Sequence, residues 1–294
     1  MQKITPHLWY DTQPIQAAEF YVSIFPNSKI TNTTTLHDTP SGDTDIVTFE
    51  VLGYEFQAIS AGPLFKFNPS ISFHVKCKTK DEVDAYWEKL SEGGMVLMEL
   101  GAYPFSERYG WLQDQYGLSW QLIYTAGPDV SQRITPAILF VGSVCGKAEE
   151  AVNFWTSVFR DAKVDGIQYY GKGEAPDQEG TVKYAAFSLF GQEFGAMDSA
   201  HEHAFAFNEA ISFIVNCDSQ EEIDYYWEKL SAVPEAEQCG WLKDKYGFSW
   251  QIVPRGMEAM LGGNDSARTA RVTQTFLEMK KIDIAKLREV YAEG

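Results

Sequence analysis

An internal repeat limits the architectures that this chain can adopt. Two stretches, GWLQDQYGLSWQL from Gly110 and GWLKDKYGFSWQI from Gly240, are almost identical. Earlier blocks recur in the same order, such as ITPHLWYD with ITPAILFVG and DEVDAYWEKLS with EEIDYYWEKLS. The repeating unit of roughly 125 residues has the size of one domain and not of a solenoid repeat. The sequence therefore predicts a tandem duplication, with one domain over residues 1–127, a second over 131–255 and a tail over 256–294.

Within each unit the apolar residues alternate between the spacing of strands and that of a helix. In the first unit, strand-like runs fall at 4–10, 30–36, 46–52, 56–60, 70–77, 96–100, 110–113 and 118–124. Residues 17–25 have helical spacing, and Thr79 with Glu82 predicts the capped start of a second helix, as Ser219 with Glu222 does in the second unit. Each domain is predicted to be a pair of βαβββ modules, an α+β fold with helices on one face of curved, mostly antiparallel sheets. Two helices are expected in the tail, over 268–280 and after Asp283.

Charge and composition argue against several classes of partner. The formal charge of −17 disfavours nucleic acid, which needs a basic surface, and anionic membranes. No apolar run is long enough to span a bilayer, and the N-terminal MQKITPHLWYDTQ lacks the apolar core of a signal peptide. The four cysteines form no CxxC pair, which excludes a zinc ribbon or a thioredoxin motif. We therefore expect a cytoplasmic protein that contacts neither nucleic acid nor a membrane.

The paired modules, the opening ITPHLWYD and the closing ERYGWLQDQYGLSWQL and CGWLKDKYGFSWQI carry a family resemblance. They resemble the vicinal oxygen chelate superfamily of glyoxalases, bleomycin-resistance proteins and dioxygenases. More closely, they resemble its PhnB-like branch, often labelled 3-demethylubiquinone-9 3-methyltransferase. The resemblance implies that two modules curl into a cup with a cavity for a small-molecule ligand. It also implies that the fused copies form a pseudo-dimer within one chain. Whether two whole chains form a further homodimer is a question that the sequence leaves open.

Metal-using members of this superfamily present His or Glu ligands from the first and last strands of a module. The matching positions in the first domain are His7, Gln57 or Ser60, Ser70 and Gln121, where metal-using relatives have Glu. In the second domain they are Ala137, Gly195 or Asp198, Ala210 and Gln251. Divalent ions gain most from imidazole or anionic donors, so we expect no metal or a weakly held one, with His7 as the one candidate ligand. His7 could equally bond a neighbouring residue, and Gln121 and Gln251 fit a shared structural hydrogen bond as well as ligand recognition.

The methyltransferase label has no support in the residues. Binding S-adenosylmethionine on a Rossmann-like sheet normally uses a Gly-rich turn between a strand and a helix. The one Gly-x-Gly of the chain starts at Gly171, is followed by EAPDQEG and a strand, and reads as a hairpin loop. We therefore expect no S-adenosylmethionine site.

The two copies have also diverged. The first has SEGGMVLMELGAYPFSERY before the repeated phrase, where the second has only SAVPEAEQC and loses most of a strand. With the change of His7 to Ala137, this points to the first domain as the working copy. The predicted site there has His7 and Gln121 as the acting residues. Its predicted binding residues are Trp9, Gln57, Ser60, Ser70, Phe105, Arg108 and Trp111.

Two classes of function follow from the resemblance, and they differ in whether a reaction occurs. The first is a non-catalytic protein that binds a small aromatic or amphipathic compound, as bleomycin-resistance members do. The second is a metal-dependent lyase, isomerase or dioxygenase, in which His7 would be a metal ligand or an acid/base and Gln121 would orient a substrate oxygen. The many aromatic residues and the poor ligand set favour the first. A scaffold without a small ligand is a third reading.

Overall fold

The computed structural model describes residues 2–39, 42–127, 130–261 and 266–292. The strands of the first repeat are β1 (Ile4–Tyr10), β2 (Lys29–Thr39), β3 (Gly42–Val51), β4 (Tyr54–Ser60), β5 (Ile71–Cys77), β6 (Met95–Tyr103), β7 (Ser106–Gln113) and β8 (Ser119–Tyr124). Those of the second are β9 (Ile134–Phe140), β10 (Lys163–Tyr169), β11 (Val182–Leu189), β12 (Gln192–Asp198), β13 (Ile211–Cys217), β14 (Trp241–Lys243) and β15 (Ser249–Pro254). The helices are α1 (Pro14–Ile24), α2 (Lys80–Ser91), α3 (Ala148–Val158) and α4 (Gln220–Leu230), followed in the tail by α5 (Met257–Leu261), α6 (Ser266–Leu277) and α7 (Ile284–Ala292). Short 3₁₀ turns lie at Gly142–Val144 and Pro234–Ala236.

This order confirms the paired βαβββ modules and the α+β class. The predicted caps are also present, because Thr79 accepts a hydrogen bond from the backbone N–H of Glu82 and Ser219 accepts one from that of Glu222. The tail contains the two expected helices, and the Asp283 side chain accepts a bond from the first turn of α7. Helix α5 was not predicted. In the described ranges, no helix is long and apolar enough to cross a membrane.

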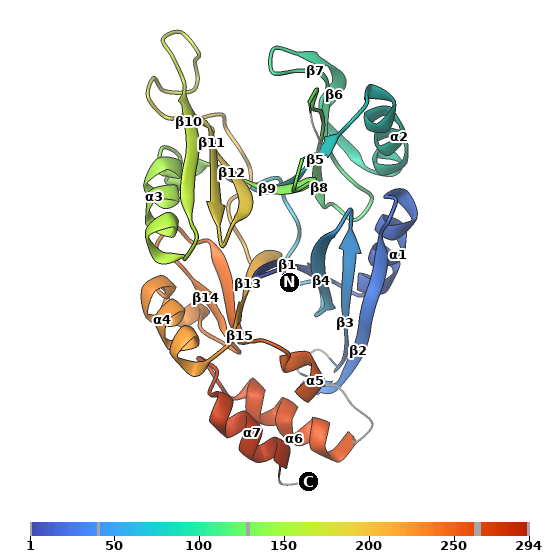
Figure 1. The fold of residues 1–294 in the computed structure, drawn as a ribbon, viewed down its shortest axis with the longest axis vertical. Coiled ribbons are helices and arrows are strands. Elements are labelled where there is room, and N and C mark those ends of the chain that lie inside the picture. Colours follow the sequence, from blue (N-terminus) through green and yellow to red (C-terminus); the bar gives the residue numbers. More distant parts are fainter. Residues whose placement is uncertain (1, 40–41, 128–129, 262–265, 293–294) are drawn as a thin grey trace.

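The described strands form two sheets, and each sheet combines strands of both repeats (Figure 1). The first, here called the His7 sheet, has the order β14-β15-β13-β1-β4-β3-β2. The second, here called the Gln121 sheet, has the order β10-β11-β12-β9-β5-β8-β7-β6. Most neighbouring strands in both sheets are antiparallel, as expected, and β1–β4, β13–β15, β5–β8 and β9–β12 are the parallel pairs.

The repeats are joined at the centre of each sheet by an antiparallel pair. In the His7 sheet β1 pairs with β13, which places His7 opposite Ser212. In the Gln121 sheet β5 pairs with β9, which places Ser72 opposite Ala137. The two modules of one repeat therefore lie in different sheets: the first module joins the fourth, and the second joins the third. The pairing hydrogen-bonds the exposed edges of β1 and β5, which would otherwise offer unpaired backbone groups to other chains.

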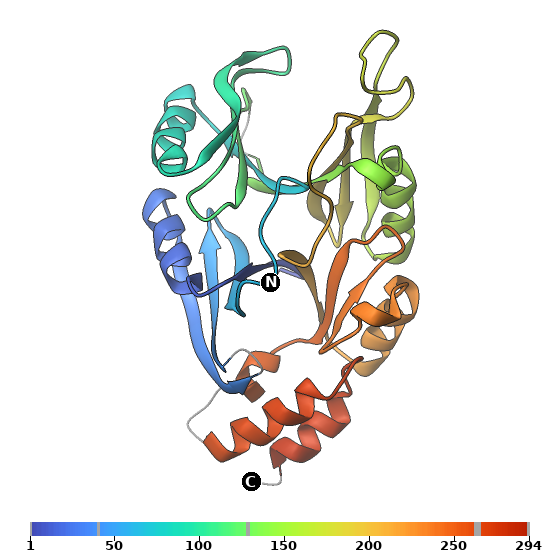
Figure 2. The ribbon, with the colours of Figure 1, turned by 180° about the vertical axis from the view of Figure 1, so that it is seen from behind.

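Helices α1 to α4 cover the outer faces of the two sheets (Figures 1 and 2). Helix α1 packs on β3 and β4, α2 on β7 and β8, α3 on β11, and α4 on β15. Because side chains alternate along a strand, residues such as Leu8 face the helices while His7 and Trp9 face away from them. We call the side turned away from the helices the inner face of each sheet.

A buried aspartate of the repeated phrase links the two modules of each repeat. Asp114 accepts hydrogen bonds from the Tyr21 hydroxyl of α1 at 2.9 Å and from the Trp120 indole at 2.8 Å. Asp244 accepts the matching bonds from the indoles of Trp155 in α3, at 2.9 Å, and of Trp250, at 3.0 Å. The phrase is thus repeated because each repeat uses its Asp and Trp to join a helix of one module to the closing turn of the next.

The stability of the fold should depend on pH through Asp114. Burial raises the pKa of this carboxyl to about 6, although bonds from Trp120 and Tyr21 act to lower it. An unfolded Asp has a pKa of about 3.9, so the folded chain binds the proton more tightly. Protonation of Asp114 therefore stabilises the folded state. This contribution is fully present below about pH 4 and is lost as the pH rises through about 6. In urea titrations from about pH 4 to pH 7, we expect the wild type to lose about 2 to 3 kcal/mol more than Asp114→Asn, which has no group to titrate. Parallel stability curves would contradict this assignment.

The second repeat ends differently from the first, as its shorter sequence predicts. Among the described residues of the second repeat, nothing corresponds to strand β6. The linker between α6 and α7 lies there instead. The backbone N–H groups of Cys239 and Gly240 donate to the carbonyls of Met279 and Lys280, each at 2.7 Å. The tail thus satisfies backbone groups that a neighbouring strand satisfies in the first repeat.

Candidate functional site

Each sheet carries a row of inner-face side chains that includes most of the positions the family resemblance pointed to, with Ser72 and Ser212 in place of Ser70 and Ala210. In the His7 sheet, His7 lies beside Gln57 on β4 and Ser212 on β13, and Gln251 donates to the Ser212 hydroxyl at 2.9 Å. The His7 row is therefore Gln57, His7, Ser212 and Gln251. In the Gln121 sheet the matching row is Gly195, Ala137, Ser72 and Gln121.

The glutamine of the repeated phrase makes the same bond in both rows. Gln121 donates to the Ser72 hydroxyl at 2.7 Å, as Gln251 does to Ser212. Gln121 also accepts a bond from the hydroxyl of Tyr109. Both glutamines are buried, at 5% and 6% exposed, so they need such partners. These bonds are the shared structural hydrogen bond, which is one of the two interpretations left open by the sequence.

The structure does not bring His7 and Gln121 together in one row. His7 lies in β1 of the His7 sheet, and Gln121 lies in β8 of the Gln121 sheet. The glutamine that completes the His7 row is Gln251, which comes from the second repeat. His7 and Gln121 therefore belong to different rows, and each row takes residues from both repeats. Sequence comparison between the repeats could not show this, because the pairing of β1 with β13 is a long-range choice.

The other predicted binding residues are divided between the two sheets. Trp9, Gln57 and Ser60 lie on strands of the His7 sheet, where the Trp9 indole donates to the Gly62 carbonyl at 2.8 Å and the Ser60 hydroxyl accepts from the Asp45 backbone N–H at 2.8 Å. Ser70, Phe105, Arg108 and Trp111 belong to the part of the chain that forms the Gln121 sheet.

Most of these residues of the Gln121 sheet already bond to other side chains or are exposed to solvent. Arg108 forms an ion pair with Asp84 at 2.6 Å, and the Trp111 indole donates to Ser119 at 2.8 Å. Phe105 is 60% exposed. These contacts explain the positions of the residues in the β6–β7 hairpin without a ligand.

His7 has an unusual environment for a polar residue. It is 3% exposed, and its Nδ1 atom has no hydrogen-bond partner among the described residues. Burial lowers the pKa of His7 to about 3, so the imidazole is neutral at physiological pH. Its ring meets that of Trp241 edge-on at 5.4 Å, and Trp241 in turn meets Trp9 at 6.2 Å. The inner face at His7 therefore combines an unpaired neutral imidazole with aromatic rings from both repeats.

A carboxylate from the tail also reaches this inner face. Glu258 of α5 accepts a hydrogen bond from Gln57, next to His7, and another from the Thr48 hydroxyl at 3.4 Å. Met257 and Leu261 of the same helix are buried, at 8% and 5% exposed, which holds the helix in place. Sequence reasoning missed Glu258 because α5 lies beyond the repeat and has no counterpart that could mark it.

The donor set of the His7 row does not fit a tightly held divalent ion. The row supplies one imidazole, two amides and one hydroxyl, and Glu258 already accepts three hydrogen bonds, from Gln57, Thr48 and Asn32. Over the ranges that the structure describes, no three His, Cys, Asp or Glu side chains are grouped as metal ligands usually are. Borderline and hard cations are held mainly by anionic or imidazole donors.

A comparison with the solved structure of a glyoxalase agrees with this architecture. Glyoxalase I from Zea mays is 13% identical, with 89% of this chain and 98% of that chain covered and a TM-score of 0.54, a likeness that shows the glyoxalase fold. The PhnB protein from Bacillus cereus is 38% identical over 42% of this chain and 100% of its own, with a TM-score of 0.40. A protein from Pseudomonas aeruginosa is 20% identical over 43% of this chain and 100% of its own, with a TM-score of 0.38. None of the curated proteins matches.

The match to a family model covers both repeats. The model described as 3-demethylubiquinone-9 3-methyltransferase matches residues 2–123 and again residues 132–253. These two matches follow the tandem duplication and leave only the short linker and the tail outside. The chain therefore belongs to the PhnB-like 3-demethylubiquinone-9 3-methyltransferase family, with two copies of its glyoxalase-fold domain joined as an internal pseudo-dimer.

Proposed function

We propose that this protein binds a small aromatic compound carrying a hydroxyl group on the inner face of the His7 sheet, without a tightly bound metal. The observation that carries the proposal is the buried Nδ1 of His7, which lacks a partner among the described residues. An unsatisfied buried polar group costs about 1 to 3 kcal/mol. A hydrogen bond from a ligand would remove that cost, and the matching position of the second repeat holds the apolar Ala137.

The surroundings of His7 support an aromatic ligand. Trp241 lies edge-on to His7, and Trp9 lies edge-on to Phe65 at 5.0 Å. Such edge-to-face contacts are the arrangement that an additional aromatic ring would extend. A neutral imidazole has one donor and one acceptor nitrogen, so it can bond a hydroxyl group without a charge on the ligand.

The alternative is a metal-dependent lyase, isomerase or dioxygenase. The position of Glu258 is the observation that supports it. This carboxylate lies against Gln57, beside the one imidazole of the row. An enzyme of this kind would use His7 and Glu258 as ligands after the bond to Gln57 is released. We propose the metal-free form because that release would leave Gln57 and Thr48 without their acceptor.

The proposal is tested by titrating phenol into the wild type and into His7→Phe, with tryptophan fluorescence as the readout. The variant keeps an aromatic ring and removes Nδ1, so phenol should bind about ten-fold more weakly while the thermal midpoint is unchanged or higher. His74→Phe is the matched control. His74 also has an unpaired buried nitrogen and a pKa lowered to about 4 by burial, but it lies in the Gln121 sheet.

The outcomes separate the two functions. Equal binding of phenol by the wild type and His7→Phe, or no binding by the wild type, would overturn the proposed site. Elemental analysis of the purified protein should find less than one equivalent of zinc, nickel, manganese or iron. A stoichiometric metal that is lost in Glu258→Gln would instead establish the metal-dependent alternative.

A further inference from the structure

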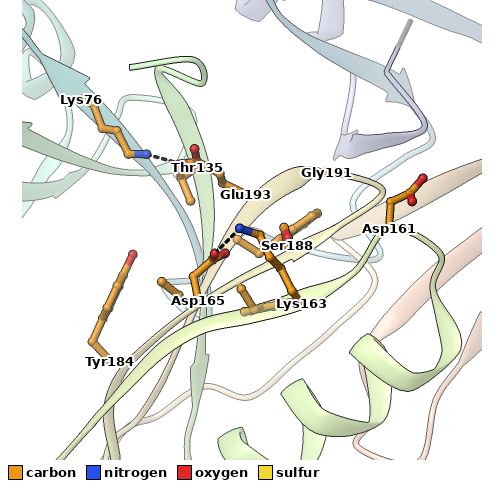
Figure 3. Close-up of a pocket in the computed structure, with 12 residues that line it drawn as sticks. Lys76, Thr135, Asp161, Lys163, Asp165, Tyr184, Ser188, Gly191 and Glu193 are labelled. Carbon is orange, nitrogen blue, oxygen red and sulfur yellow. Dashed lines mark hydrogen bonds and ion pairs between the residues drawn. The ribbon is translucent and has the colours of Figure 1, made fainter. Parts of the chain in front are cut away.

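A second region of unsatisfied polar groups lies on the inner face of the Gln121 sheet, at its second-repeat end. A pocket with a volume of ≈ 400 Å³ opens there (Figure 3). Pockets of this size are typical of small-molecule sites. It lies one step along the strands from the Ala137 row, because its lining residues Thr135 and Glu193 precede Ala137 and Gly195 by two positions. It is therefore distinct from the row of Gly195, Ala137, Ser72 and Gln121.

Two buried hydroxyls line this pocket without a hydrogen-bond partner. Thr135 is 2% exposed and Ser188 is 3% exposed, and neither hydroxyl has a partner within the described part of the chain. Buried hydroxyl groups are paired in the large majority of cases. Two unpaired hydroxyls lining one pocket therefore indicate a missing partner and not a packing defect.

The first repeat supplies a matched comparison for Thr135. Thr5 occupies the same place in the His7 sheet, and its hydroxyl donates to Glu55 at 3.2 Å and accepts from Asn216 at 3.4 Å. In the Gln121 sheet, Lys76 stands where the other sheet has Asn216. It forms an ion pair with Glu193, the counterpart of Glu55.

This substitution explains why Thr135 is unpaired. The lysine attracts the carboxylate that would otherwise accept from the threonine. Ser188 has changed as well, because its counterpart in the first repeat is Glu50, which pairs with Lys29 at 3.3 Å. The second-repeat pocket has thus lost two internal interactions that the His7 sheet retains.

The walls of the pocket define the chemistry that would fit it. Lys76 is paired with Glu193, and Lys163 with Asp165 at 2.7 Å, so both lysines are already neutralised (Figure 3). A ligand would meet the two free hydroxyls, the side chain of Tyr184 and the carboxylate of Asp161, which can accept hydrogen bonds from hydroxyl groups. Hydroxyls can both donate and accept, and an aromatic ring offers a face to C–H groups.

We infer that this pocket binds an uncharged polyhydroxylated molecule of the sugar or cyclic polyol class. Its hydroxyl groups would pair with Thr135 and Ser188, and its C–H face would lie against Tyr184. The ion pairs of Lys76 with Glu193 and of Lys163 with Asp165 remain in place, so binding needs no charge on the ligand. This site is independent of the proposed function, because it lies on the other sheet and shares no residue with the His7 row.

The test is an NMR titration of the full chain with D-glucose and with myo-inositol, with acetate and ethylammonium as charged probes. The double variant Thr135→Val with Ser188→Ala should bind the polyols about ten-fold more weakly or not at all. Its thermal midpoint should not fall, because the hydroxyls that it removes have no partners in the free protein. Thr5→Val is the matched control: it should lower the thermal midpoint and leave polyol binding unchanged.

Three outcomes would overturn the inference. These are the absence of binding by both polyols, equal binding by the double variant, and binding of acetate or ethylammonium in place of the polyols. His7→Phe should bind the polyols like the wild type. This site and the His7 site can therefore fail separately.

Discussion

Replacing Asp244 with alanine is expected to lower the free energy of unfolding by about 3 to 5 kcal/mol. The carboxylate is completely buried and accepts from the indoles of Trp155 and Trp250 and from the backbone N–H groups of Tyr246 and Phe248. Alanine would leave all four donors inside the core without an acceptor. The loss is smaller than the sum of four bonds because burial also raises the pKa of Asp244, which means that the charged form is itself held at a cost.

This prediction is measured by calorimetry at neutral pH, where the thermal midpoint should fall by about 10 °C. Asp11→Ala is the control, since Asp11 is exposed and its substitution should change stability by less than about 0.5 kcal/mol. Asp244→Asn keeps one acceptor oxygen and should fall between the two. If Asp244→Ala and Asp11→Ala have the same thermal midpoint, the buried carboxylate does not hold the modules together.

Replacing Gly240 with alanine should cost about 2 to 4 kcal/mol, from two separate causes. Gly240 has a φ of +84°, a conformation that strains any residue with a Cβ. An added Cβ would also lie 2.9 Å from the carbonyl oxygen of Ile252, which is backbone and cannot move aside by itself. A shift of the strand would break the bond from the Gly240 N–H to Lys280 and so loosen the tail.

Gly247→Ala separates these causes. Gly247 has a φ of +79° but no atom within 4 Å of an added Cβ, so its substitution should cost only the backbone strain of about 1 kcal/mol. Urea unfolding of both variants gives the difference. Limited proteolysis should in addition cleave the tail faster in Gly240→Ala alone. Equal losses in the two variants would show that the contact with Ile252 is without consequence.

Local patterns predicted the elements of this protein well, because they depend on neighbouring residues. The capped helix at Thr79 and the tail helix after Asp283 follow from side chains within one turn of the backbone. The sequence did not separate the two roles of glycine in the repeated phrase. Gly110 is needed because an added Cβ would lie 2.3 Å from the Trp87 ring, whereas Gly240 is needed for its backbone conformation and its contact with Ile252.

The site was harder to predict than the fold, since it depends on which distant strands pair. The sequence grouped His7 with Gln121 because both belong to the first repeat, whereas the pairing of β1 with β13 puts His7 in one row with Gln251 of the second repeat. Asp244 was overlooked although a charged residue inside a repeated, largely apolar phrase is itself a signal of a buried hydrogen-bond acceptor. Glu258 had no such signal, as it lies outside the repeat.

The exchange of strands between the repeats has a consequence for how this protein can evolve. In a symmetric dimer of identical subunits, every substitution appears in both binding faces at once. Here each face takes strands from both copies, and each position is encoded separately, so a mutation on one face spares the other. The two faces have already lost their symmetry. One has His7 opposite Ser212 where the other has Ala137 opposite Ser72, and the tail contacts Gln57, the neighbour of His7, on the first face. The tandem duplication thus gives this protein two inner faces that selection can alter one at a time.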